Sequence, residues 1–173
     1  MHNIRTVAYE NIATGDVTNV PSDATIGQGV TIGAEVVLGR RVQLENYVTL
    51  EPGVILSDDV TIKFGGVVGS NTIVESDVII GIAGKIGKRC VIHKRVVIGD
   101  MVCIDNNVTI DEDAIVKDIV EIDNGTTIGK RVHIGFASEI KGDLAIDDDE
   151  VVSECSIIYA INGVKQPPAL KRF

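Results

Sequence analysis

The sequence predicts an all-β chain in which very short strands alternate with tight corners at a fixed spacing. Every sixth residue from Val20 to Val164 is Val, Ile or Leu, and the phase never changes. Two places before these positions a smaller residue such as Val30 is common. Gly often follows directly, and Asn or Gly is frequent at the third place, as at Asn71 and Asn107. These three regularities together predict a solenoid built from six-residue units.

The physical basis is the period of two along a β-strand. Residues i−2 and i point inward while residue i−1 points outward, so each unit buries two side chains. The next three residues form a corner, because Gly and Asn tolerate the left-handed backbone that a tight turn requires. An α-helix turns every 3.6 residues and cannot keep a six-residue period on one face. The repeat therefore favours a parallel β-helix.

Composition agrees with one aliphatic core. The 173 residues are 45% hydrophobic but only 3% aromatic, so the core must consist of many similar Val and Ile side chains. A chain of this length is expected to form one domain and is long enough to bury a core.

The pattern of an aliphatic residue, Gly, and a small residue at the fifth place resembles the hexapeptide-repeat family over residues 20–164. The resemblance implies a left-handed parallel β-helix, in which three hexads form one triangular coil of 18 residues. We expect about eight coils over residues 20–164, with no inserted loop. Residues 1–19 are expected to lead into or cap the helix, and residues 165–173 to form a tail. Pro167 and Pro168 cannot continue a strand ladder.

With coils of 18 residues, one column of corners carries alternating charge. Residues 18 apart should stack about 4.8 Å apart. The sequence therefore predicts a ladder of opposite charges, with Lys94 and Arg95 near Asp77 or near the acidic corner that follows. The corners are Ser57-Asp58-Asp59, Glu75-Ser76-Asp77, His93-Lys94-Arg95, Asp111-Glu112-Asp113, Gly129-Lys130-Arg131 and Asp147-Asp148-Asp149.

The outward i−1 residues sort into three faces, two of them apolar. Apolar stripes on a surface usually mark a partner interface, although β-helix faces are also rich in β-branched residues. We expect a homotrimer through the two apolar faces, as the family's trimers imply. One face carries Val37, Ile55, Ile73, Val91 and Thr109; the next carries Ile79, Val97, Ile115, His133 and Val151; the third, more polar, carries Thr49, Val67, Lys85, Cys103 and Glu121.

Two short motifs resemble sugar N-acetyltransferases within the family. They are Cys90-Val91-Ile92-His93 through Val96-Val97-Ile98-Gly99-Asp100, and Asp105-Asn106-Asn107-Val108-Thr109-Ile110. The resemblance implies an acyl-CoA-dependent acyltransferase that acetylates an amino sugar or a nucleotide sugar. Acetyl-CoA would be a co-substrate, with no tightly bound cofactor.

The sequence departs from that family at its usual base. The family places a His two residues after an aliphatic position, whereas this chain has no His there and carries Asp100 at the aligned place. The first choice for proton acceptor is therefore His93, because Glu75 and Asp111 should flank it and a flanking carboxylate orients an imidazole. The alternative is that His93 only supplies a positive charge between two acidic residues of the ladder.

Three further side chains are candidate substrate-binding groups. Asn106 and Asn107 offer amides to the acceptor, although their simplest role is turn formation. His133 faces outward on an apolar face, where it would reach a neighbouring subunit or simply line an interface.

Two other functions stay open. A non-catalytic structural or assembly β-helix fits the unbroken repeat, the missing base and the missing loop. A metal site like that of the γ-carbonic anhydrases needs three ligands across two subunits, here His93, His133 and a carboxylate such as Asp111.

Charge and cysteine content exclude several partners. A net charge of −9 disfavours nucleic acid and anionic membranes as partners. No membrane span and no signal peptide is recognisable. The three cysteines have no metal-type spacing and fit free thiols, so we expect a cytoplasmic protein.

Overall fold

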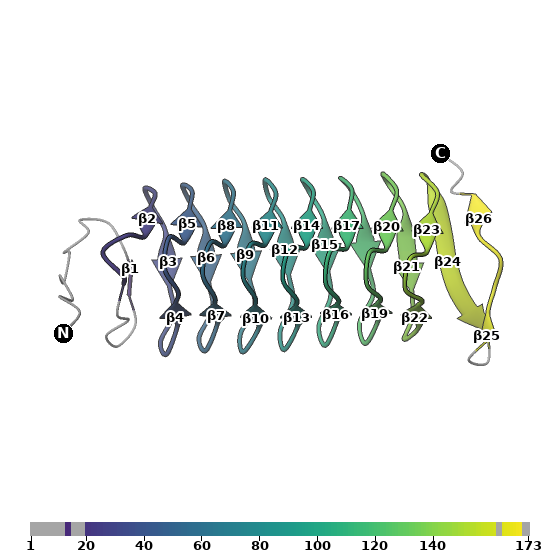
Figure 1. Ribbon diagram of the computed structural model, residues 1–173, viewed down its shortest axis with the longest axis horizontal. Coiled ribbons are helices and arrows are strands. Elements are labelled where there is room, and N and C mark those ends of the chain that lie inside the picture. The colour runs from purple at the N-terminus through teal and green to yellow at the C-terminus, as the bar shows by residue number, and fades with distance from the viewer. Residues whose placement is uncertain (1–12, 15–19, 162–163, 171–173) are drawn as a thin grey trace.

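The computed structural model describes residues 13–14, 20–161 and 164–170, and within these ranges it contains strands and corners but no helix. Almost every strand is two residues long, and the chain winds regularly along one long axis (Figure 1). The strands form three sheets, one on each side of a triangular coil. No helix that could cross a membrane occurs in the described residues.

Sheet A contains one strand from each coil and, at its C-terminal end, two strands that pair antiparallel. It consists of β1 (Ala13–Thr14), β3 (Thr31–Ile32), β6 (Thr49–Leu50), β9 (Val67–Val68), β12 (Lys85–Ile86), β15 (Cys103–Ile104), β18 (Glu121–Ile122), β21 (Glu139–Lys141), β24 (Ser156–Ile161), β25 (Val164–Lys165) and β26 (Ala169–Leu170).

Sheet B consists of β2 (Thr25–Ile26), β5 (Gln43–Leu44), β8 (Thr61–Ile62), β11 (Ile79–Ile80), β14 (Val97–Ile98), β17 (Ile115–Val116), β20 (His133–Ile134) and β23 (Val151–Val152). Sheet C consists of β4 (Val37–Leu38), β7 (Ile55–Leu56), β10 (Ile73–Val74), β13 (Val91–Ile92), β16 (Thr109–Ile110), β19 (Thr127–Ile128) and β22 (Ala145–Ile146).

The register confirms the 18-residue coil. Ile79 pairs with Val97, and Val97 pairs in turn with Ile115, always in parallel and always 18 residues apart. Parallel pairing ends at β24, against which β25 and β26 pair antiparallel. Residues 1–12, 15–19, 162–163 and 171–173, and hence most of the expected lead segment, lie outside the described residues.

The sixth-residue positions fill the interior, as the repeat predicts. Every one of them from Ile32 to Ile158 is buried, while Val20 and Ile26 at the start are partly buried. The side chain of Val164 lies outside the described residues. These positions form one continuous aliphatic core with the smaller residues two places before them.

Polar residues in that inner column are satisfied by hydrogen bonds. Thr72 is fully buried, and its hydroxyl donates to the carbonyl oxygen of Gly87 at 2.8 Å. Cys90 is buried beside it, and burial raises the pKa of its thiol.

The described corners from 27–29 onward end on a residue with left-handed backbone, except the corner 142–143, where Gly142 has this conformation. Arg95 (φ 61°), Asn107 (φ 58°) and Asp113 (φ 63°) are examples at the third place of their corners. The corners stack into three edges of the prism. The charged edge joins sheet C to sheet B at residues 39–41, 57–59, 75–77, 93–95, 111–113, 129–131 and 147–149.

The other two edges differ in chemistry. The apolar edge joins sheet B to sheet A at residues 27–29, 45–47, 63–65, 81–83, 99–101, 117–119, 135–137 and 153–155. The polar edge joins sheet A to sheet C at residues 33–35, 51–53, 69–71, 87–89, 105–107, 123–125 and 142–143.

Candidate functional site

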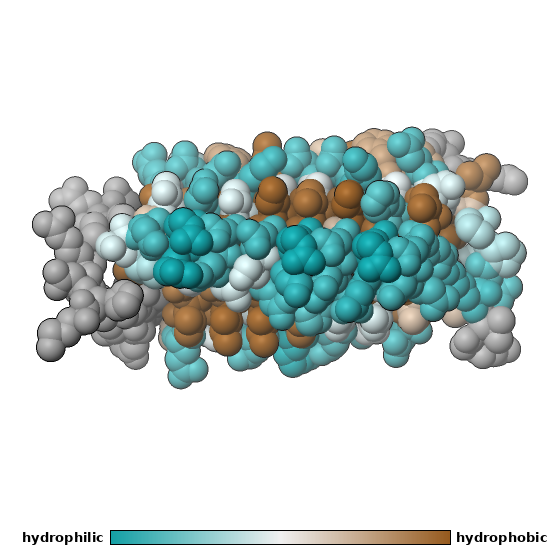
Figure 2. Space-filling view, in the orientation of Figure 1, coloured by the Kyte–Doolittle hydropathy of each residue, from teal (hydrophilic) through white to brown (hydrophobic). Residues whose placement is uncertain are grey.

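The charged edge is the most polar feature of the surface that Figure 2 shows. A hydrophilic band runs along the molecule, with rows of hydrophobic side chains on both sides. The flanking residues belong to sheets B and C, as the sequence predicts. Val37, Ile55, Ile73, Ile79, Val97 and Val151 are exposed among them.

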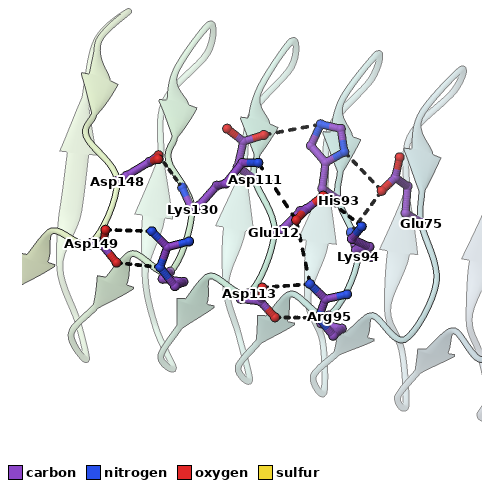
Figure 3. Close-up of polar contacts among 11 residues, drawn as sticks. Glu75, His93, Lys94, Arg95, Asp111, Glu112, Asp113, Lys130, Asp148 and Asp149 are labelled. Carbon is purple, nitrogen blue, oxygen red and sulfur yellow. Dashed lines mark hydrogen bonds and ion pairs between the residues drawn. The ribbon is translucent and has the colours of Figure 1, made fainter.

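Ion pairs connect successive coils along this edge (Figure 3). Lys94 Nζ lies 3.1 Å from Glu112, and the Arg95 guanidinium donates two hydrogen bonds to Asp113 at 2.6 and 2.8 Å. The guanidinium lowers the pKa of the Asp113 carboxyl, and Asp113 in turn raises the pKa of Arg95. The predicted charge ladder around Lys94 and Arg95 is confirmed.

The same pairing repeats at other coils of the edge. Arg41 pairs with Asp59, and Arg131 donates to Asp149 at 2.6 and 2.7 Å. Each carboxyl has its pKa lowered by the arginine 18 residues before it.

His93 lies between the two carboxylates that the sequence predicts. Its Nδ1 atom is 3.2 Å from Glu75 Oε2, and its Nε2 atom is 3.5 Å from Asp111 Oδ1 (Figure 3). The His93 side chain keeps 30% of its surface exposed, so a small molecule can reach the ring. Three of the four predicted catalytic residues are thus adjacent on one edge.

The two contacts of His93 differ in how firmly they are held. Glu75 Oε2 also accepts the backbone N–H of Lys94 at 3.1 Å, which fixes this carboxylate beside Nδ1. At 3.5 Å, the contact between Nε2 and Asp111 is at the outer limit of a hydrogen bond. Glu75 is therefore the closer and better anchored of the two carboxylates beside His93. The anchoring N–H of Lys94 is not visible in the sequence pattern.

Asp100, the fourth predicted catalytic residue, lies on the apolar edge and is separated from His93 by strand β14. Its Oδ1 atom accepts the backbone N–H of Ile82 at 2.8 Å, and its own N–H donates to Asp118 at 2.9 Å. Asp100 thus caps the corner one coil below.

This cap recurs and explains much of the glycine pattern. Asp or Asn at the second corner position accepts the N–H of the equivalent residue one coil below, as Asp58, Asn106 and Asp148 also do. A Cβ at Gly81 would lie 2.5 Å from Asp100 Oδ1, so glycine is required where the cap reaches back. Pairs such as Gly81 and Asp100, 19 residues apart, are the sequence feature that identifies these caps.

Asn106 and Asn107 lie on the polar edge and both serve the corner. Asn106 accepts the N–H of Lys88 at 2.8 Å. Asn107 has left-handed backbone, accepts Arg89 Nε at 2.9 Å and donates to Asn124 at 2.9 Å. Their amides are therefore occupied within the chain, and neither lies on the edge that carries His93.

His133 projects from sheet B, between Ile115 and Val151 of the adjacent strands. It is exposed, as the sequence predicts, but it lies on a face and not on the charged edge. Only Glu75, His93 and Asp111 are brought together within one chain.

Metal ligands and nucleophilic thiols are not assembled in the part of the chain described. No group of three His, Cys, Asp or Glu side chains there is placed to hold a metal ion. Burial raises the pKa of the Cys103 thiol, as it does for Cys90, which makes their thiolates less available.

One protein family and several solved structures resemble the chain. A model of the family described as GMPPB C-terminal domain matches residues 13–113. Comparison with curated protein sequences gives no match.

The similar structures are acyltransferases. UDP-N-acetylglucosamine acyltransferase from Campylobacter jejuni is 13% identical with a TM-score of 0.56, over 92% of this chain and 74% of that one. The Francisella novicida enzyme is 16% identical with a TM-score of 0.51, over 93% and 69%. The acetyltransferase domain of PglB from Neisseria gonorrhoeae, solved with acetyl coenzyme A, is 15% identical with a TM-score of 0.47, over 91% and 57%. The first two show the fold, the expected left-handed parallel β-helix of hexapeptide repeats.

Proposed function

The chain belongs to the GMPPB C-terminal domain family, and within it we propose that this β-helix is an acyl-CoA-dependent acyltransferase acting on an amino sugar or a nucleotide sugar. One observation carries the proposal: His93 is partly exposed, and its Nδ1 atom lies 3.2 Å from the carboxylate of Glu75, which the backbone N–H of Lys94 anchors. That is the arrangement by which a histidine is oriented as a general base.

In the proposed reaction Glu75 and His93 move one proton. With Nδ1–H donated to Glu75, the Nε2 atom accepts a proton from the acceptor amine as its nitrogen attacks the thioester carbonyl. A C–N bond forms, the C–S bond breaks, and the proton passes from Nε2 to the departing thiolate. Asp111 stands 3.5 Å from Nε2 and must turn aside to admit the amine.

An amine acceptor suits a site whose only proposed base is His93. An unprotonated amine is a better nucleophile toward a thioester than a hydroxyl, although its nitrogen must still give up a proton, here to His93, as the C–N bond forms. Acetyl-CoA is the donor we propose, used as a co-substrate and not as a bound cofactor.

A homotrimer through the apolar faces of sheets B and C completes the proposal. The charged edge lies between these faces, so His93 would lie near the junction of two subunits. The His133 side chain on sheet B would then reach a neighbour. Free Cys90, Cys103 and Cys155 support a reducing compartment, for which we propose the cytoplasm.

The experiment measures thiol released from acetyl-CoA with a panel of nucleotide-linked amino sugars. We expect turnover by the unmodified chain and a loss of 10²-fold or more in kcat for His93→Ala, roughly the contribution of a general base. Glu75→Gln should lower kcat less, because an amide still accepts Nδ1–H while losing the negative charge.

Asp113→Asn is the matched control. It removes a carboxylate from the same edge, one that pairs with Arg95 and does not touch His93. Equal turnover by wild type and His93→Ala would contradict the role of His93. A wild-type chain with neither turnover nor coenzyme A binding would contradict the enzyme altogether.

A non-catalytic β-helix module is the second candidate, and two observations favour it. Both imidazole nitrogens of His93 face carboxylates, which suits a cationic rung as well as a base. Asp100, Asn106 and Asn107 are engaged in corner hydrogen bonds. Under this alternative His93→Ala lowers the melting temperature and no acceptor in the panel supports thiol release.

A further inference from the structure

The apolar edge carries a continuous row of large exposed side chains on six successive coils. They are Tyr47, Phe64, Ile82, Met101, Ile119 and Phe136, each between 40% and 57% exposed. Phe64 and Tyr47 already pack against each other edge to face, with ring centroids 5.5 Å apart. The proposed acyl transfer uses none of these residues, and the row lies on a different edge from His93.

We propose that this edge is a self-complementary surface through which two copies of the chain associate antiparallel about a two-fold axis. The axis lies in the plane of contact, perpendicular to the long axis of the helix. Corner 45–47 of one copy then meets corner 135–137 of the other, corner 63–65 meets 117–119, and corner 81–83 meets 99–101. Such a contact is isologous, so each pairing occurs twice.

At the third corner position this pairing sets a large side chain against a small one at every level. Tyr47 meets Ala137, Ile119 meets Gly65, and Met101 meets Ala83. All six residues have left-handed backbone, with φ between 54° and 66°, so the side chains of the five that carry one leave the edge in similar directions. Knobs on one half of the edge therefore face holes on the other half.

At the second corner position a large side chain again lies opposite a smaller one. Here the large side chains stand in the corners whose third residue is small. Phe136 meets Asn46, Phe64 meets Asp118, and Ile82 meets Asp100. Each of these polar side chains is a corner cap that bonds a backbone N–H one coil below, at 2.7 to 2.9 Å. The caps lie back along their own chain and leave room for the apolar side chain opposite.

Ile119 adds an independent reason to assign function to the edge. A β-branched residue at φ 60° is a rare conformation, because Cβ crowds the backbone there. Strained residues of this kind persist where a side chain is needed in one place. In the antiparallel pair Ile119 occupies the space that Gly65 leaves, and no atom lies within 4 Å of a Cβ built at Gly65.

The area is sufficient for a specific contact. Six side chains of this size, 40% to 57% exposed, offer about 90 Å² each, or roughly 1,100 Å² over both copies. Specific interfaces bury about 1,000 Å² or more. A second copy of the chain thus satisfies both the shape and the area of the edge.

The test measures the molar mass of the full chain by sedimentation velocity at micromolar concentration. The proposal expects wild type at twice the mass of Met101→Glu, because a charge on the knob cannot enter the hole. Ala83→Met fills the hole and should halve the mass as well. Ile161→Glu, an equally drastic change at a 53% exposed site at the end of β24 that lies away from the apolar edge, should leave the mass unchanged.

The exchange of knob and hole is the decisive variant. Ala83→Met with Met101→Ala places the large side chain where the small one was, in both copies, and should restore the doubled mass. Circular dichroism checks that every variant is folded. A wild-type mass that Met101→Glu and Ala83→Met leave unaltered overturns the proposal, and so does an exchanged pair that stays at half mass.

Discussion

The charged edge and the apolar edge share one backbone and differ only in their side chains. Both stack corners every 18 residues, and both end each corner in left-handed backbone, as at Arg95 and Met101. The charged edge pairs its groups within the chain, as Arg95 does with Asp113. On the apolar edge Met101 stays 57% exposed. An edge whose groups are paired internally fixes register, whereas an edge with unburied apolar groups is suited to a partner.

This difference also separates stability from association. Exposed ion pairs contribute little to folding, because solvent screens them and long side chains must be ordered. The aliphatic core beneath both edges supplies most of the stability. Substitutions in the core should therefore lower stability more than substitutions on either edge. Substitutions on the charged edge should alter stability, and those on the apolar edge should alter association.

The largest effect is expected from a charge placed beneath both edges. Ile98 is 1% exposed, and its strand β14 runs from a charged-edge corner to an apolar-edge corner. Ile98→Asp buries a charge without a partner, so we expect a loss of roughly 4 kcal/mol or more and no folded chain. Urea denaturation followed by circular dichroism measures it.

Val97→Asp is the control for that change. Val97 precedes Ile98 in the same strand but points outward and is 38% exposed. The chain should stay folded with this substitution. If Ile98→Asp melted at the same temperature as Val97→Asp, the inward assignment of the repeat would be wrong.

The next effect compares two glycines of the apolar edge. A Cβ at Gly81 would lie 2.3 Å from the carbonyl oxygen of Gly99, while a Cβ at Gly65 meets nothing. Gly81→Ala must push two coils apart and should cost roughly 2 to 3 kcal/mol. Within one chain Gly65→Ala adds only the strain of left-handed backbone, about 1 kcal/mol, so both glycine variants are compared in the Met101→Glu background, where association is already lost. If denaturant titrations gave the same loss of unfolding free energy for both variants, close contact between coils would not be the reason for glycine at position 81.

The repeat made the fold predictable because each part of it is local. The inward position, the outward position and the 18-residue stack follow from the strand period and the hexad. Thus Lys94 and Glu112, or His93 between Glu75 and Asp111, could be located from the sequence.

The apolar edge and the corner caps were not predicted, for a physical reason. Phe64 and Ile82 occupy the second corner position, whereas Met101 and Ile119 occupy the third, so no single column of the repeat contains the row. Only the folded corner shows that both positions open onto the same edge. The caps, including Asp100, depend on a side chain that reaches one coil back, and a hexad pattern does not display that contact.

A smaller effect concerns the charged edge in acid. Arg95 lowers the pKa of Asp113 below its ordinary value of 3.8. A group whose folded pKa is depressed stabilises the fold above its unfolded pKa, and this stabilisation disappears as pH falls through the folded value. At pH values below about 4 the melting temperature of the wild type should therefore decrease. The melting temperature of Asp113→Asn should decrease less over the same pH range.

Arg95→Gln gives an independent check of the cause. It removes the guanidinium that lowers the pKa of Asp113, so its melting temperature should lose the same part of the acid dependence. Melting curves of wild type and both variants between pH 2 and 6 test this. Parallel pH profiles would mean that the pair between Arg95 and Asp113 does not act on folding.

The smallest effect, and the one that separates the two edges most directly, is that of salt. At 1 M ionic strength the screening length is about 3 Å, against about 10 Å at 0.1 M. The difference in melting temperature between wild type and Asp113→Asn should shrink across that range, because it arises from exposed charges. Association through the apolar edge should persist in the same buffers and strengthen in sulfate, which favours burial of apolar surface. In the same samples, added salt would then reduce the difference in melting temperature between wild type and Asp113→Asn, while the fraction of associated chain seen in sedimentation would stay constant or rise. If salt instead dissociated the doubled species, charged groups would hold the two copies together, and the contact would have to be sought on the charged edge.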